Sequence, residues 1–107
     1  MKNRYSMLPE RNMCAAIPLT TIGVNEVAWR EKDAIDLVIY LASVNYPVLG
    51  GDVYQIKEGR IVHTLDSWYI NTGVESIDCY QQSISYIQKY ESSNTGDFLY
   101  SVIFRVS

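Results

Sequence analysis

The strongest constraint on the fold is the pair Glu58-Gly59, which lies between two segments rich in strand-forming residues. Glycine adopts positive φ with little steric cost, and tight turns with positive φ join the antiparallel strands of a hairpin. One segment ends at Lys57 and the other begins at Arg60. The sequence therefore predicts a β-hairpin in the middle of the chain.

A double glycine, Gly50-Gly51, follows Val48-Leu49 and precedes Asp52. Consecutive glycines forgo packing and add chain entropy, so they are usually placed where the backbone needs positive φ, a bulge or a close approach. No phosphate-binding loop or dinucleotide motif surrounds them. We expect a bend into the first strand of the hairpin that lets Trp68 pack closely and presents Asp52.

Two segments show the periodicity of amphipathic helices. The first spans residues 31–44, with acids in its first turns, where the helix dipole favours them, and Pro47 just beyond its end. The second starts after a cap at Thr72 or Ser76 and runs to about Tyr90. The apolar stripes consist of Ala34, Leu37, Val38, Leu41 and Ala42 in the first helix and of Ile77, Tyr80, Ile84 and Ile87 in the second.

The remaining segments are less regular. Residues 98–106 alternate in a way that predicts one long strand with a strongly apolar face. Residues 23–29 fit either a helix or a short strand, and residues 13–22, interrupted by Pro18, fit a short turn or edge element. Residues 1–12 are polar and mixed, and we expect a loosely held, flexible arm.

Together these elements predict an α+β fold, in which an antiparallel sheet of three to four strands (the central hairpin plus the C-terminal strand) packs against two helices. A parallel sheet is less favoured, because it requires strands that alternate regularly with helices. A chain of 107 residues has room for one hydrophobic core. We therefore expect a single α+β domain over residues 13–107, after the arm of residues 1–12.

The composition argues against several function classes. Twelve acids and nine bases give a net charge of −3, which argues against binding to nucleic acid or to an anionic membrane. No apolar run reaches the roughly 18 residues of a membrane span, and the N-terminus has no secretory signal. Cys14 and Cys79 lack metal-ligand spacing and are expected to be free thiols. These features favour a cytoplasmic protein.

Candidate catalytic groups are few. His63 is the sole histidine and neither cysteine has a motif around it, so we expect no metal site and no Cys/His dyad. Asp52, Asp66, Glu75 and Asp78 can in principle converge, and a pair of carboxylates performs acid–base chemistry, but solvated acids and helix starts explain them more simply. We predict a protein that is not an enzyme and has no cofactor. The alternative is a small ligand-binding or hydrolytic domain with an acid pair near the double glycine.

Aromatic residues provide better candidates for a binding surface. The chain contains nine tyrosines, two tryptophans and two phenylalanines, and tyrosine serves half-buried positions and recognition surfaces alike. Trp29 and Trp68 are expected mainly in the core, because tryptophan is more often a core residue than an interface residue. Tyr69, directly after Trp68, is expected to be partly exposed.

The chain also contains an ordered series of short motifs: Gly23-Val24-Asn25-Glu26, Ala28-Trp29, Leu49-Gly50-Gly51-Asp52-Val53-Tyr54, Asp66-Ser67-Trp68-Tyr69, Glu75, Ser83 and Tyr86-Ile87. This series, over about residues 19–106, resembles the immunity protein 40 family of bacterial polymorphic toxin systems. Ser67 stands where the family typically has Asn, which weakens any role tied to that amide. The resemblance implies a cytoplasmic protein that binds and neutralises a cognate toxin domain delivered by a neighbouring cell.

If the resemblance holds, acids and aromatics near the hairpin are the candidates for toxin binding. The residues that we predict for this role are Asp52, Tyr54, Asp66, Trp68, Tyr69 and Glu75. Gly50, Gly51 and Trp29 are predicted to have structural roles. The expected partner is the cognate toxin protein, with no nucleic acid and no membrane, and the protein is expected to be a monomer or, if an open strand edge pairs with a second copy, a homodimer.

Overall fold

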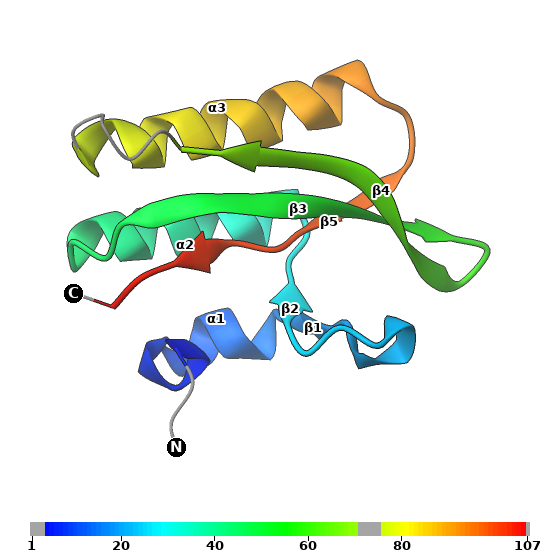
Figure 1. The fold of residues 1–107 in the computed structure, drawn as a ribbon, viewed down its shortest axis with the longest axis horizontal. Coiled ribbons are helices and arrows are strands. Elements are labelled where there is room, and N and C mark those ends of the chain that lie inside the picture. The colour runs from blue at the N-terminus through cyan, green and yellow to red at the C-terminus, as the bar shows by residue number, and fades with distance from the viewer. Residues whose placement is uncertain (1–3, 71–75, 107) are drawn as a thin grey trace.

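The structure of the protein is a computed structural model that describes residues 4–70 and 76–106. The helical elements are η1 (Arg4–Met7), α1 (Glu10–Cys14), η2 (Thr20–Ile22), α2 (Glu31–Ser43) and α3 (Ser76–Ser93), where η denotes a 3₁₀ helix. The strands are β1 (Ile17–Pro18), β2 (Val27–Ala28), β3 (Val48–Lys57), β4 (Arg60–Tyr69), β5 (Asp97–Tyr100) and β6 (Ile103–Phe104). The fold is α+β, as predicted (Figure 1).

The main sheet has four antiparallel strands with β3 at its centre. β4 pairs along one edge of β3, whereas β5 and β6 both pair along the other edge. β1 and β2 form a second, two-stranded sheet. Reciprocal backbone hydrogen bonds between Trp29 and Tyr100, of 2.9 and 2.7 Å, join the end of that small sheet to β5. Residues 23–29, for which the sequence allows a helix or a strand, contain the short strand β2. In the four-stranded sheet, β4 lies at the edge.

The predicted hairpin is confirmed. Glu58 and Gly59 connect β3 to β4 with φ angles of 53° and 77°, the positive values that a two-residue hairpin turn requires. The double glycine lies inside β3 and not in a bend before it, because Gly51 pairs with Trp68 in the ladder. A Cβ atom on Gly51 would collide with the Trp68 ring and with the Ser101 carbonyl oxygen. The predicted close approach of Trp68 to the double glycine is thus confirmed.

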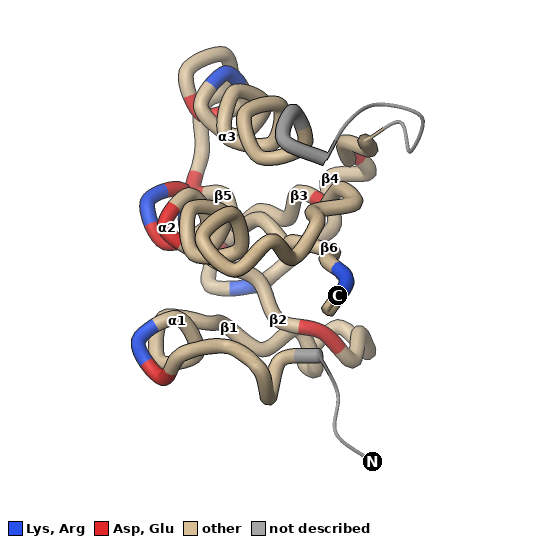
Figure 2. Tube along the Cα trace, turned by 90° about the vertical axis from the view of Figure 1, so that its left-hand side faces the viewer, with Lys and Arg blue, Asp and Glu red and all other residues tan. Residues whose placement is uncertain are grey.

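Helices α2 and α3 cover one face of the main sheet (Figures 1 and 2). In Figure 2 they lie on one side of the sheet, and α1, β1 and β2 form a separate layer beneath them. α2 forms where the sequence predicts it and buries Ala34, Leu37, Val38 and Leu41 against the core. Ile39, on the outer side of the same helix, is 55% exposed.

The face of α3 that meets the sheet is only partly the predicted one: Ile87 of the predicted stripe is fully buried, as expected. Cys79 and Ser83 are buried, whereas Tyr80 and Ile84 of the predicted stripe are only partly buried. The reason is Trp68, whose ring lies between β4 and α3 and needs small side chains above it. The Ser83 hydroxyl accepts a hydrogen bond from its indole nitrogen, so this local requirement overrides the apolar periodicity.

Residues 98–106 form two strands and not the single long strand that was predicted. Between β5 and β6, the Ser101 backbone N–H donates to the Asp52 carbonyl oxygen at 2.9 Å, and the Asp52 N–H donates to the Ser101 hydroxyl at 3.0 Å. These contacts draw the chain across Gly51, which has no side chain to block it. The strand is interrupted at the point where the double glycine allows this close approach.

The opposite face of the sheet is covered in part by the segment that contains β1, η2 and β2. Leu19, Ala28, Tyr54 and Leu99 form a second buried cluster there. Because neighbouring strand residues point to opposite faces, Val53 belongs instead to the helix-covered core. The central strand is therefore apolar on both faces along part of its length.

The N-terminal segment, which the sequence favours as a loosely held arm, contains η1 and α1, and both contact the core. Leu8 and Asn12 are buried. The Asn12 carbonyl oxygen accepts a hydrogen bond of 2.8 Å from the Trp29 indole nitrogen, and the Tyr5 ring packs edge-on against Trp29 at 6.4 Å. These few apolar contacts within a polar stretch hold residues 5–12 against the domain.

Candidate functional site

The candidate site is centred on β4, where the neighbouring residues Trp68 and Tyr69 point to opposite faces. Trp68 is 8% exposed; its indole nitrogen donates to the Ser83 hydroxyl at 3.0 Å, and its ring stacks on Tyr86 with a centroid separation of 5.0 Å. Tyr69 is 82% exposed. The predicted burial of Trp68 is confirmed, and Tyr69, predicted to be partly exposed, is exposed over most of its surface.

An open hollow of about 320 Å³ lies beside Tyr69. Its lining includes Gly50, Asp52, Ser67 and Ile103, with the double glycine as its floor. At Gly50, φ is 146° and a Cβ atom would collide with the carbonyl oxygen of the partner strand, so only glycine fits there. The face of the hairpin that points away from α2 and α3 is here called its outer face. It is concave next to the exposed Tyr69 ring and the Asp52 carboxylate.

Asp52 lies beside His63 on this face. The distance from His63 Nε2 to Asp52 Oδ1 is 3.9 Å, and the imidazole ring packs against Tyr54 with a centroid separation of 4.6 Å. Burial, followed by the nearby carboxylates of Asp52 and Glu26, raises the pKa of Tyr54 to about 12. Tyr54 is thus a buried neutral phenol at physiological pH and supports the surface from below.

The second strand of the hairpin contains a bulge. The register between β3 and β4 shifts between Asp52 and Tyr54, so that Val53 lies opposite residues 64–66 of β4. Such a bulge bends a strand and changes the direction of its side chains. At its centre Leu65 has a φ of 72°, a left-handed conformation that costs a leucine about 1–3 kcal/mol. Its side chain is 86% exposed, so burial does not offset this strain.

Side-chain hydrogen bonds fix the bulge on both sides of Leu65. The Thr64 hydroxyl donates to the Val53 carbonyl oxygen at 2.8 Å and accepts from the Asp66 N–H at 3.1 Å. The Leu65 N–H donates to His63 Nδ1 at 2.8 Å. Because Nδ1 accepts this bond, the neutral imidazole carries its proton on Nε2. The bulge is therefore a defined conformation held by its own side chains.

The two predicted acids of the hairpin have different partners. Asp66 accepts a hydrogen bond of 2.8 Å from the Tyr90 hydroxyl of α3, whereas Asp52 faces His63. Burial, followed by this bond to a carboxylate, raises the pKa of Tyr90. Within residues 4–70 and 76–106 no group of three or more His, Cys, Asp or Glu side chains is placed to hold a metal ion.

Of the other predicted residues, Trp29 and Tyr54 are buried. Trp29 lies in the core at the junction of the two sheets, which agrees with its predicted structural role. Thr72 and Glu75 lie outside the described residues, as do the side chains of Ile77 and Asp78. Trp68 and Tyr54 are therefore positioned to support the site, and Asp52 and Tyr69 to form its surface, whereas Asp66 points toward Tyr90 of α3 on the other face.

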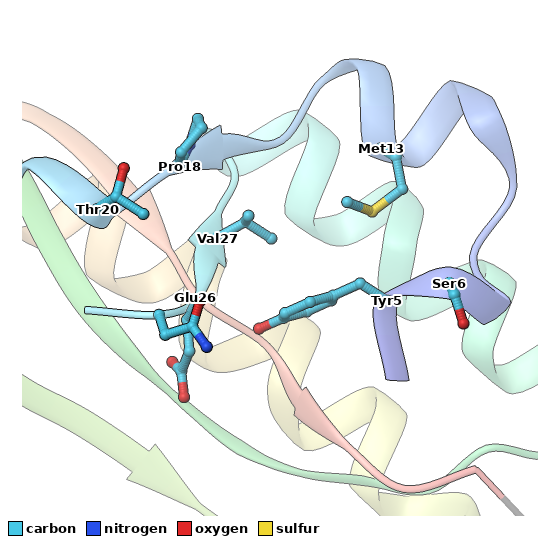
Figure 3. A pocket seen from close by; sticks show the side chains of 8 residues that line it. Tyr5, Ser6, Met13, Pro18, Thr20, Glu26 and Val27 are labelled. Carbon is cyan, nitrogen blue, oxygen red and sulfur yellow. The ribbon is translucent and has the colours of Figure 1, made fainter. Parts of the chain in front are cut away.

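A larger pocket of about 590 Å³ lies between the N-terminal segment and β2 (Figure 3). Figure 3 shows the Tyr5 ring extending across it toward Glu26 and Val27, with Met13 nearby. The residues that line it are Tyr5, Ser6, Met13, Pro18, Thr20, Asn25, Glu26 and Val27. This lining has one carboxylate and no histidine, cysteine or basic side chain, so it offers polar contacts but no catalytic set.

Sequence reasoning missed three contributors to the hairpin surface: Leu65, Thr64 and Tyr90. The order Thr-Leu-Asp contains no glycine or proline, and leucine is disfavoured at positive φ, so no local signal indicated the bulge. The partnership of Tyr90 with Asp66 joins residues 24 positions apart. Only the packing of α3 beside β4 brings them together.

These features define a small α+β protein whose outer hairpin face presents an aromatic ring, a carboxylate and an apolar side chain on strained backbone, which is the character of a protein-binding module. The sequence matches the family Immunity protein 40 over residues 18–104, and the chain therefore belongs to that family. No curated protein and no solved structure matches it. No helix among the described residues has the length and apolar character needed to span a membrane.

Proposed function

We propose that the protein neutralises a toxin domain by binding it directly, and that the outer face of the β3–β4 hairpin makes the contact. The observation that supports this most strongly is the match to the Immunity protein 40 family over residues 18–104. The inhibition is stoichiometric and non-catalytic, and it takes place in the cytoplasm of the bacterial cell that makes the protein. The partner is the toxin domain encoded beside this gene.

The charge pattern supports a basic partner surface. Residues 61–88 contain Asp66, Glu75 and Asp78 and no lysine or arginine, and Asp52 adds a partly exposed carboxylate on β3. An excess of acids accelerates the encounter with a surface of opposite sign, and salt screens this acceleration. We therefore expect the association rate to fall as ionic strength rises.

Tyr69 has the properties of an interface residue. It is 82% exposed in the described structure and lies beside the hollow floored by the double glycine. A tyrosine buried on binding contributes a large apolar area and a hydroxyl at low cost in side-chain entropy. Its contribution is expected mainly in the dissociation rate.

The test uses a catalytically inactivated form of the toxin domain and measures binding by surface plasmon resonance and calorimetry. Tyr69→Ala and Asp52→Ala should each weaken binding, by at least about tenfold for Tyr69, while thermal melting stays within a few degrees of wild type. Ile39→Ala and Asp36→Ala on α2 are the matched controls, since these side chains are exposed on another face. Unchanged affinity for both hairpin variants would exclude this face, and a wild type with no affinity for the toxin domain would exclude direct neutralisation.

A further inference from the structure

Leu65 has a backbone conformation that the fold does not explain. Among the described residues, three non-glycine residues have positive φ: Asn45, Glu58 and Leu65. Asn45 follows the C-terminus of α2, and Glu58 forms the hairpin turn, which are positions where positive φ is expected. Leu65 lies in the middle of β4 and belongs to neither buried cluster. The positive φ of Leu65 therefore neither forms a turn nor places its side chain in the core.

The surroundings of Leu65 are ordered although its side chain is exposed. The hydroxyl of Thr64 bridges the two strands, and His63 and Tyr90 hold the flanking residues. An apolar side chain on a rigid support is suited to insertion into a partner, because little conformational entropy is lost on binding. A bulge on an edge strand also disfavours further strand pairing, so recognition by this side chain fits better than addition of a strand.

We propose that Leu65 is the apolar anchor of the toxin contact, and that it inserts into an apolar pocket of the toxin domain that is bordered by basic residues. This inference rests on the proposed function and identifies the residue that dominates it. The Asp52 carboxylate, on the outer face of the hairpin, provides the charge complementarity for the basic border. Tyr69 lies four residues along the strand, about 13 Å away, so that both side chains fit within one interface of ordinary size.

The test compares Leu65→Ala and Leu65→Asn with Ile39→Ala, which truncates an exposed apolar residue on α2. Asparagine tolerates left-handed backbone, so Leu65→Asn keeps the bulge and removes only the apolar side chain. The probe is the inactivated toxin domain, with binding followed by surface plasmon resonance. Both Leu65 variants should lose at least about 30-fold in affinity, mostly through faster dissociation, with an unchanged or raised melting temperature. Ile39→Ala should stay within twofold of wild type.

Three results would overturn the proposal. If wild type binds the toxin domain and both Leu65 variants bind within twofold of it, the anchor assignment is wrong while direct neutralisation stands. If light scattering shows a wild-type dimer that Leu65→Asn converts to a monomer with full toxin affinity, Leu65 serves self-association. Absence of wild-type binding would remove the anchor together with the proposed function, so the two failures are distinguishable.

Discussion

Two parts of β4 that lie only a few residues apart, around Trp68 and around Leu65, have opposite effects on stability. Around Trp68, the absence of a side chain at Gly51, the hydroxyl of Ser83 and the ring of Tyr86 all favour the folded state. Around Leu65, the backbone is strained and a large apolar side chain is exposed to water. The contacts around Trp68 stabilise the folded state, whereas the strained backbone and exposed side chain of Leu65 lower its stability.

This difference is informative because natural sequences are locally consistent except where function opposes stability. The bulge is not a weak point of the sheet, since its residues are hydrogen-bonded on both sides. It is therefore a specified conformation that contributes nothing to the core. Substitutions that separate stability from binding test this interpretation most directly.

A large loss of stability is expected for Gly51→Ala. The added Cβ would collide with the Ser101 carbonyl oxygen and the Trp68 ring, and because one of these is backbone, β3 and the β5–β6 connection must both shift. We expect a loss of about 3 kcal/mol or more in the free energy of unfolding, measured by urea denaturation.

The matched control is Gly59→Ala in the hairpin turn. Gly59, unlike Gly51, has positive φ, and nothing lies within 4 Å of a Cβ placed there, so the loss should be only about 1 kcal/mol from backbone strain. Equal losses for the two variants would show that the close approach at Gly51 does not constrain the fold.

The next prediction compares the stability of variants at the neighbouring residues Trp68 and Tyr69. Trp68→Ala should destabilise the protein by about 3–5 kcal/mol, because it leaves a cavity under α3 and removes the partner of the buried Ser83 hydroxyl. Tyr69→Ala should change the unfolding free energy by less than about 0.5 kcal/mol, since its side chain is exposed. Chemical denaturation of both variants measures the difference. Similar losses would contradict the assignment of the two residues to opposite faces.

The extent to which the sequence predicts this structure depends on how local each signal is. The hairpin follows from Glu58-Gly59 and its flanking strands, and α2 follows from one apolar stripe, so both could be predicted. The buried face of α3 could not, because Ser83 is selected by a ring that comes from a different strand. The interruption of the C-terminal strand depends in the same way on the contact of Ser101 with the double glycine.

The candidate site shows the same division. The opposite orientations of Trp68 and Tyr69 could be predicted from their adjacency in a strand and from the chemistry of the two side chains. The bulge could not, since a leucine at positive φ goes against its own propensity and the contacts that hold it come from β3 and α3. The residue with the most unusual environment on this surface is therefore one that local rules assign to an ordinary strand.

The smallest effect concerns a polar contact on the helix-covered side, between Glu91 and Tyr100. The Tyr100 hydroxyl donates to Glu91 Oε1 at 3.1 Å, yet burial raises the pKa of Glu91 above its ordinary value of 4.5 and outweighs this hydrogen bond, which lowers it. The folded state then binds more protons than the unfolded state between the two pKa values. This contribution to stability is complete below pH 4.5 and is lost as pH rises through the folded pKa.

Glu91→Gln should remove this contribution, because the amide keeps an acceptor for Tyr100 and does not ionise. Relative to wild type, the variant should gain stability as pH rises from 4 to 7 and show no gain near pH 3, measured by urea denaturation at each pH. Tyr100→Phe should act in the opposite direction, since loss of the donated hydrogen bond raises the Glu91 pKa further and widens the pH range of the loss. If the difference in unfolding free energy between wild type and Glu91→Gln is constant across this range, the burial of Glu91 does not lower the stability of the folded state.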